Sequence, residues 1–150
     1  MAETLGSLVD KLSIKEIRHW HITRARKNAK TKQMLRILNN QICDLEREID
    51  WFLSEAIKGH VRLQDEKLKM YNPWVKKKYL SSSLGDLTRA LCEKNLQLWH
   101  LEDDIRQPDI DEHQIAILKR KIDTANQERN DLIDEIDRQL EKVLKRKKKK

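Results

Sequence analysis

Apolar residues recur at helical spacing along four stretches of the chain. The clearest pattern fills seven successive core positions of a heptad repeat: Leu35, Leu38, Ile42, Leu45, Ile49, Phe52 and Ala56. Similar patterns occupy residues 5–20, 84–105 and 115–143. Spacings of three and four residues place such side chains on one face of an α-helix. The sequence therefore predicts an all-α fold of four helices.

Capping signals predict where two of these helices begin. Ser7 followed by Asp10 has the spacing of a capping box, so the first helix is expected to begin near residues 4–7. Ser83 followed by Asp86 has the same spacing and predicts the start of the third helix.

The two halves of the chain carry the same pattern. Residues 5–22 align without a gap on residues 84–101, and residues 39–50 match residues 126–137 at a different offset. The first alignment pairs Gly6 with Gly85, Trp20 with Trp99, and His21 with His100. We therefore predict a four-helix bundle built from two repeated antiparallel helical hairpins, related by a pseudo-two-fold axis.

The repeat also predicts the domain organisation. Residues 1–144 are expected to form one helical-bundle domain, with repeats over about 4–58 and 83–144 joined by a linker at 59–82. The net charge is +7, and residues 145–150 contribute six of these charges, so the body is nearly neutral. A run of like charges repels itself, which predicts a basic disordered tail.

Composition bears on the cellular compartment. Cys43 and Cys92 lie far apart within helical patterns, so we expect two buried thiols in a reducing compartment, with no zinc spacing and no disulfide. The first residues lack the features of a signal peptide. No apolar run approaches the roughly 20 residues of a membrane span. These features predict a cytoplasmic protein without a transmembrane segment.

A histidine followed by carboxylates is the strongest candidate for chemistry. Asp103 and Asp104 follow His100 by three and four residues, which on a helix places them beside the imidazole. They could raise the histidine pKa or orient a ring nitrogen for acid–base work or for a metal. The alternative is an acidic helix end that faces solvent. Trp99 is expected to be mostly buried and His100 to lie at the edge of the core.

Repeated acidic residues extend this candidate site. Asp44 and Glu48 match Asp131 and Glu135, and could line a polar groove or form ion pairs between helices. The candidate ligand or partner site comprises Trp99, His100, Glu102, Asp103, Asp104, His21, Asp131 and Glu135. No catalytic residue, cofactor or metal is assigned. A carboxylate-bridged di-metal site would need Glu-x-x-His on two helices, and only Glu16 with His19 supplies it.

Spaced residues of the second half carry a family resemblance. They include Trp99-His100-Leu101-Glu102-Asp103, Ile105-Arg106, Pro108, Ile110-Asp111, Leu118-Lys119-Arg120, Ile122-Asp123, Asn126-Gln127, Arg129, Asp131-Leu132 and Ile136-Asp137. Over roughly residues 84–140 the chain resembles the bacterial domain-of-unknown-function family 4254, and the first half resembles a divergent second copy. The resemblance implies a helical bacterial protein, associated with genes for cell-surface glycans and lipopolysaccharide. It implies no established reaction.

The favoured interpretation is a non-enzymatic, cytoplasmic helical interaction protein with a protein partner or a homo-oligomeric assembly. By analogy with the family, it is linked to the assembly of cell-envelope glycans. One alternative is a binder of nucleic acid or an anionic surface. Its contacts would come from the tail: Lys145, Arg146, Lys147, Lys148, Lys149 and Lys150. The other alternative is an enzyme or sugar-ligand binder with a cleft of Trp, His and acidic residues.

Overall fold

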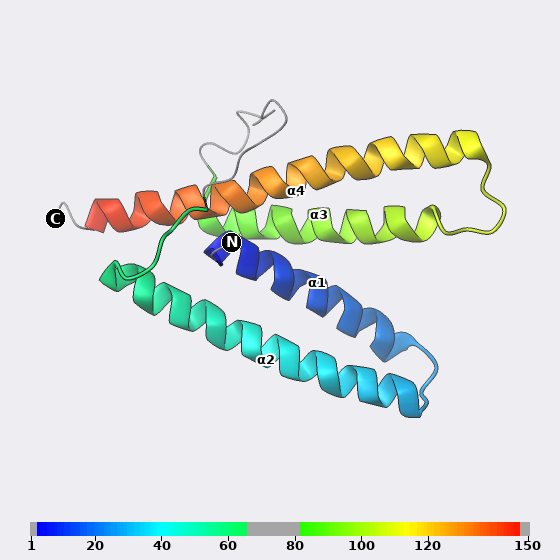
Figure 1. Cartoon of the computed structure of the whole chain (residues 1–150), viewed down its shortest axis with the longest axis horizontal. Helices are drawn as coiled ribbons and strands as arrows, with labels where there is room; N and C mark the ends of the chain where they lie inside the picture. The colour runs from blue at the N-terminus through cyan, green and yellow to red at the C-terminus, as the bar shows by residue number, and fades with distance from the viewer. Residues whose placement is uncertain (1–2, 66–81, 148–150) are drawn as a thin grey trace.

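A computed structural model describes residues 3–65 and 82–147 of the chain. Its helices are α1 (Leu5–Arg24), α2 (Ala29–Lys58), α3 (Leu84–Asp104) and α4 (Glu112–Lys147), and these residues contain no strand. Helix α1 pairs with α2, and α3 pairs with α4, in two antiparallel hairpins (Figure 1). The all-α prediction is confirmed, whereas the pseudo-two-fold axis stays a prediction.

Helix α1 begins with a different cap from the one predicted. Thr4 is the N-cap: its hydroxyl accepts from the Ser7 N–H at 3.3 Å, and the Ser7 hydroxyl accepts from the Thr4 N–H at 2.9 Å. Ser7 is therefore the third helical residue, and Asp10 lies buried further along the helix. The predicted box at the start of α3 is confirmed, because the Asp86 N–H donates to the Ser83 hydroxyl at 3.1 Å.

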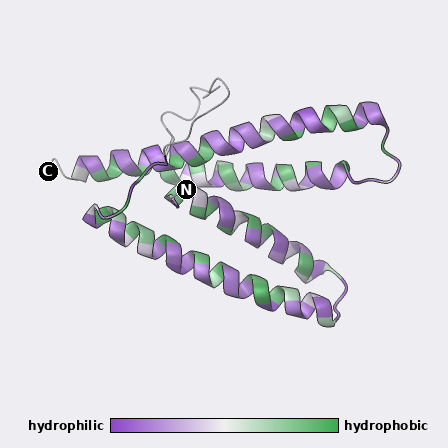
Figure 2. Ribbon diagram, in the orientation of Figure 1, coloured by the Kyte–Doolittle hydropathy of each residue, from purple (hydrophilic) through white to green (hydrophobic). Residues whose placement is uncertain are grey.

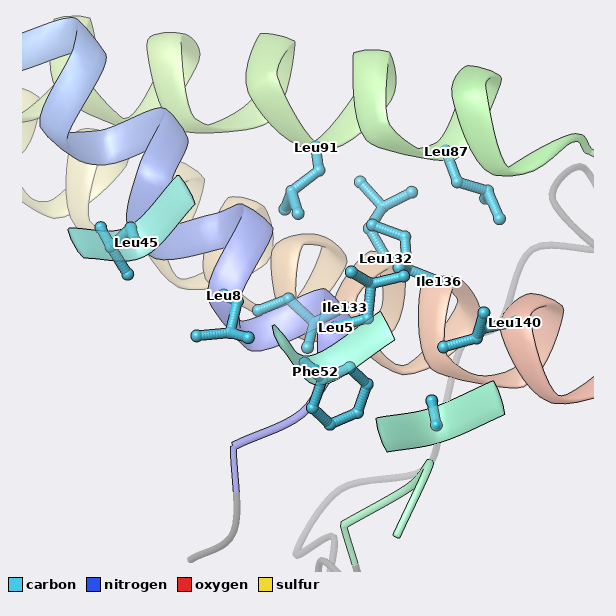
Figure 3. Close-up of a cluster of buried hydrophobic side chains, with 11 residues drawn as sticks. Leu5, Leu8, Leu45, Phe52, Leu87, Leu91, Leu132, Ile133, Ile136 and Leu140 are labelled. Atoms are coloured by element: carbon cyan, nitrogen blue, oxygen red, sulfur yellow. The ribbon is translucent and has the colours of Figure 1, made fainter. Parts of the chain in front are cut away.

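The main core lies where the two hairpins meet, and all four helices contribute side chains to it (Figure 3). Its buried members are Leu5, Leu8, Leu45, Phe52, Ala56, Leu87, Leu91, Leu132, Ile133, Ile136 and Leu140. A smaller cluster of Leu98, Leu101 and Ala125 joins α3 to α4 further along the second hairpin. Hydrophobic and hydrophilic residues alternate along each helix (Figure 2), as expected for helices that bury one face.

Helix α1 is the centre of the arrangement. It packs against α2, α3 and α4, whereas α2 packs mainly against α1. From their shared core the hairpins diverge towards the connections at residues 25–28 and 105–111 (Figure 1).

Several details differ from the sequence-based expectations. Cys43 and Cys92 are exposed rather than buried. Trp20 is 51% exposed, although it is the repeat partner of Trp99. Helix α4 continues through Lys147, so the first residues of the predicted tail are helical, and residues 148–150 lie outside the described ranges.

The predicted linker at 59–82 lies largely outside the described residues, which stop at 65 and resume at 82. None of the described helices combines the length and apolar character needed to cross a membrane.

Candidate functional site

A groove of about 670 Å³ lies between the two hairpins, on the side where they diverge. Its apolar lining comes mainly from α1 and α3: Ile14, Ile17, Ile22, Met34, Leu98 and Trp99. Its charged lining consists of Arg18, Glu102, Arg106 and Arg129. The groove thus combines an apolar surface with three arginines and one carboxylate.

Two aromatic rings stack across the groove. The imidazole of His21 on α1 lies parallel to the indole of Trp99 on α3, with ring centroids 4.6 Å apart and planes 15° apart. The Trp20 and His21 rings are nearly perpendicular, with centroids 4.8 Å apart, and the Arg24 guanidinium lies 3.8 Å from the centre of the Trp20 ring. These residues form a continuous row from the exposed end of α1 to the wall of the groove.

A polar network joins the hairpins at the groove lining, which includes Asn95 and Arg129. The Asn95 side-chain amide on α3 donates to Asp10 Oδ1 at 2.8 Å and to Ser13 Oγ at 2.6 Å, both on α1. Arg129 of α4 forms an ion pair with Asp10 at 3.7 Å. The sequence did not reveal this network, because Asn95 and Arg129 lie more than 80 residues from Asp10 along the chain.

Three polar atoms of groove residues are buried without a hydrogen-bond partner: Trp99 Nε1, His21 Nε2 and Arg129 Nε. An indole N–H and a guanidinium N–H can only donate. Leaving such a buried donor unsatisfied costs about 1–3 kcal/mol. An acceptor oxygen that reached these atoms would therefore be favoured.

The groove includes only part of the predicted site. Trp99, His21 and Glu102 line it, and Trp99 is partly buried. His100 and Asp103 are exposed on α3 and do not line the groove.

Asp104 is also exposed and outside the groove, and neither it nor Asp103 forms a hydrogen bond with His100. Asp103 instead lies 3.7 Å from Arg106. The structure therefore favours the solvent-facing alternative over a contact between His100 and these aspartates.

The repeated acidic residues of α4 also lie outside the groove. Glu135 is only 2% exposed and pairs with Arg138 at 3.1 Å and with Lys142 at 3.7 Å. Its partners lie on its own helix, so the ion-pair interpretation applies within α4 rather than between hairpins. Asp131 is half-buried and does not line the groove. Across residues 3–65 and 82–147, no group of three His, Cys, Asp or Glu side chains is arranged to hold a metal ion.

Comparisons with known proteins bear on the second hairpin. Neither the curated proteins nor the solved structures gave a significant match to this chain. A family model described as "Protein of unknown function (DUF4254)" matches residues 85–150, which include nearly all of α3 and all of α4. This match confirms, for the second hairpin, the resemblance carried by the residues around Trp99.

Proposed function

We propose that this chain is a non-enzymatic binding protein whose partner molecule occupies the groove between the hairpins. The observation that carries this proposal is the presence in the groove lining of two residues, Trp99 and Arg129, with buried N–H donors that lack a hydrogen-bond partner. The ligand that fits best carries a carboxylate, phosphate or sulfonate group on an apolar body. The charged group would supply acceptor oxygens, and the apolar body would cover the apolar lining.

Charge supports an anionic partner. Arg18 forms no ion pair with the described part of the chain, and the contact of Arg129 with Asp10 is long at 3.7 Å. Only Arg106 is closely neutralised, by Glu102 at 3.1 Å. The groove therefore retains positive charge that an anionic group would compensate.

Size and lining support an apolar body. Pockets that hold small ligands usually measure about 300–1,000 Å³ and are mostly apolar with a few placed polar groups. The volume of about 670 Å³ falls within that range. Ile17, Met34 and Leu98 would contact the apolar part, and the arginines would contact the charged part.

The side chains of the groove suit binding better than acid–base chemistry. A general base must reach the proton that it takes, and a neighbouring group usually orients it. The His21 ring is stacked on Trp99, and the Glu102 carboxylate is paired with Arg106. The free surface thiols, Cys43 and Cys92, suit the reducing cytoplasm that we propose as the compartment. A link to cell-envelope glycans rests on the family resemblance alone.

The test uses 8-anilinonaphthalene-1-sulfonate, which carries a sulfonate on an aromatic body. We expect saturable binding to the folded protein, with energy transfer from Trp99 to the dye. Arg18→Glu should weaken this binding at least tenfold, because it replaces a groove cation by an anion. Lys119→Glu is the matched control, since Lys119 is an exposed cation outside the groove.

Circular dichroism must show that both variants remain folded, because the dye also binds loosely packed states. Equal loss of binding in Arg18→Glu and Lys119→Glu would contradict the groove as the site. Absence of saturable binding to the folded protein would also contradict it.

A further inference from the structure

The body of the chain is nearly neutral overall, but its positive and negative charges are concentrated at different hairpin ends. Residues 17–43 contain no Asp or Glu and carry seven cations: Arg18, Arg24, Arg26, Lys27, Lys30, Lys32 and Arg36. We call these seven residues the basic tip, because they surround the connection between α1 and α2. Residues 102–112, at the end of the other hairpin, carry six acidic residues and only one cation.

The charges of the basic tip are not neutralised by acidic side chains of the described residues. All seven are exposed, and none forms an ion pair with the described residues. Exposed cations elsewhere do pair, as Arg47 does with Asp44 at 3.1 Å and Arg89 with Glu93 at 3.0 Å. Uncompensated like charges repel one another, so an external polyanion would relieve this repulsion on binding.

An exposed aromatic ring accompanies these cations. Trp20 is 51% exposed, and the Arg24 guanidinium lies 3.8 Å from the centre of its ring. Proteins that bind single-stranded nucleic acid combine cations, which contact the phosphates, with aromatic rings, on which bases stack. Cations and an exposed aromatic ring occur together at the end of the first hairpin.

We propose that the basic tip binds single-stranded nucleic acid, with its cations on the phosphates and Trp20 stacked on a base. This site is distinct from the groove, with which it shares Arg18. The acidic end of the other hairpin repels phosphate, which confines the strand to the α1–α2 side.

The spread of the cations favours a flexible strand over a lipid surface. Arg18 lies six residues before Arg24, and Arg36 lies seven residues after Ala29, the first residue of α2. At about 1.5 Å per residue, both lie roughly 9–10 Å behind the connection. If a flat bilayer met the tip end-on, Arg18 and Arg36 would lie about one Debye length from its surface. A flexible strand can follow the cations along the sides of the hairpin.

The first experiment measures the anisotropy of a labelled oligothymidylate of about 16 nucleotides at several salt concentrations. If all seven cations contact phosphates, the slope of log K against log salt should be about −5. The variant Arg26→Gln/Lys27→Gln/Lys30→Gln should bind at least tenfold more weakly and reduce the slope by about two. These side chains are exposed, so melting curves should match those of the unsubstituted protein.

The matched control removes three charges from the tail, as Lys145→Gln/Arg146→Gln/Lys147→Gln. Its affinity should fall much less than that of the tip variant. If the tail variant loses as much affinity as the tip variant, or if the slope of the tip variant is unchanged, the basic tip is not the site.

The second experiment tests the aromatic contact. Trp20→Ala should weaken binding by about tenfold, and Trp20→Phe should restore most of the affinity because it keeps a ring. Duplex DNA and phosphatidylserine vesicles serve as competitors. Equal or tighter binding of either competitor would overturn the assignment to single strands, as would full affinity in Trp20→Ala.

Discussion

The backbone N–H of Gly6 donates a 2.7 Å hydrogen bond to Asp137 Oδ1, which joins the first turn of α1 to α4. The first turn of a helix has N–H groups without partners in the helix, and a negative charge there is favourable. Helix α1 has no acidic residue in its own first turn. Asp137 of the other hairpin therefore supplies the charge, and this contact requires the two backbones to approach closely.

Gly6→Ala should destabilise the protein by about 1–3 kcal/mol through overpacking. A Cβ at this position would lie 2.3 Å from the Ile133 carbonyl oxygen, so the two helices would have to separate. Gly85→Ala is the control, because the nearest atom to its Cβ would be Ser83 Oγ at 3.9 Å. Urea unfolding checks both variants. Equal stability of the two would contradict the close contact of α1 with α4.

Asn95→Ala should cost about 1.5–3 kcal/mol, since it removes the hydrogen bonds to the Asp10 carboxylate and the Ser13 hydroxyl and leaves Asp10 with the long contact to Arg129. The exposed Gln97→Ala, on the same helix, should cost less than about 0.5 kcal/mol. Denaturant titration of the two variants measures the difference. A similar small loss in both would mean that the buried network contributes little to holding the hairpins together.

Trp99→Ala should destabilise the protein more than His100→Ala does. Trp99 is half-buried and stacked on His21, so its removal should cost about 2–3 kcal/mol, near the low end for a truncated aromatic side chain. His100 is exposed, and His100→Ala should stay within about 0.5 kcal/mol. Thermal melts of both variants provide the comparison. If His100→Ala is the more damaging change, the orientation described for α3 is incorrect.

Ser83→Ala should lower the melting temperature at neutral pH. The Ser83 hydroxyl donates to Asp86 Oδ2 at 2.7 Å, and this hydrogen bond holds the pKa of the Asp86 carboxyl below its ordinary value. Because the pKa of Asp86 is lowered in the folded state, its ionised carboxylate stabilises the fold at pH values above the unfolded-state pKa of about 3.9. This stabilisation is lost as the pH falls through the folded-state pKa. The difference between the two proteins should therefore narrow below about pH 4. A pH-independent difference would argue against this role for Asp86.

The Cys92 thiol should react slowly for a surface cysteine. Partial burial raises its pKa, and a hydrogen bond with Ser13 opposes that effect only in part. In a Cys43→Ser background, reaction with a disulfide reagent at about pH 8 should be slower in the folded protein than in urea, because less thiolate is present. The pH at which the rate rises should also be higher in the folded protein. Equal rates and equal pH profiles in both states would contradict the raised pKa.

Local periodicity determined the helices. The heptad pattern predicted that Leu38, Ile42, Leu45 and Phe52 share one face, and all four are buried in α2. Such a pattern is readable from sequence because residues three and four apart on a helix are neighbours whatever the rest of the chain does. The same holds for the Ser83–Asp86 cap, whose contacts span three residues.

The tertiary structure decided which of these residues meet across the hairpins. The repeat pairs Gly6 with Gly85, yet only Gly6 lies against another backbone. It likewise pairs His21 with His100, yet only His21 lines the groove, where it stacks on Trp99. Contacts between hairpins depend on the angle and register at which helices pack, and many distant side chains determine these together. The sequence therefore determined the helices and their apolar faces, while the packing of α1 against α3 and α4 created the groove.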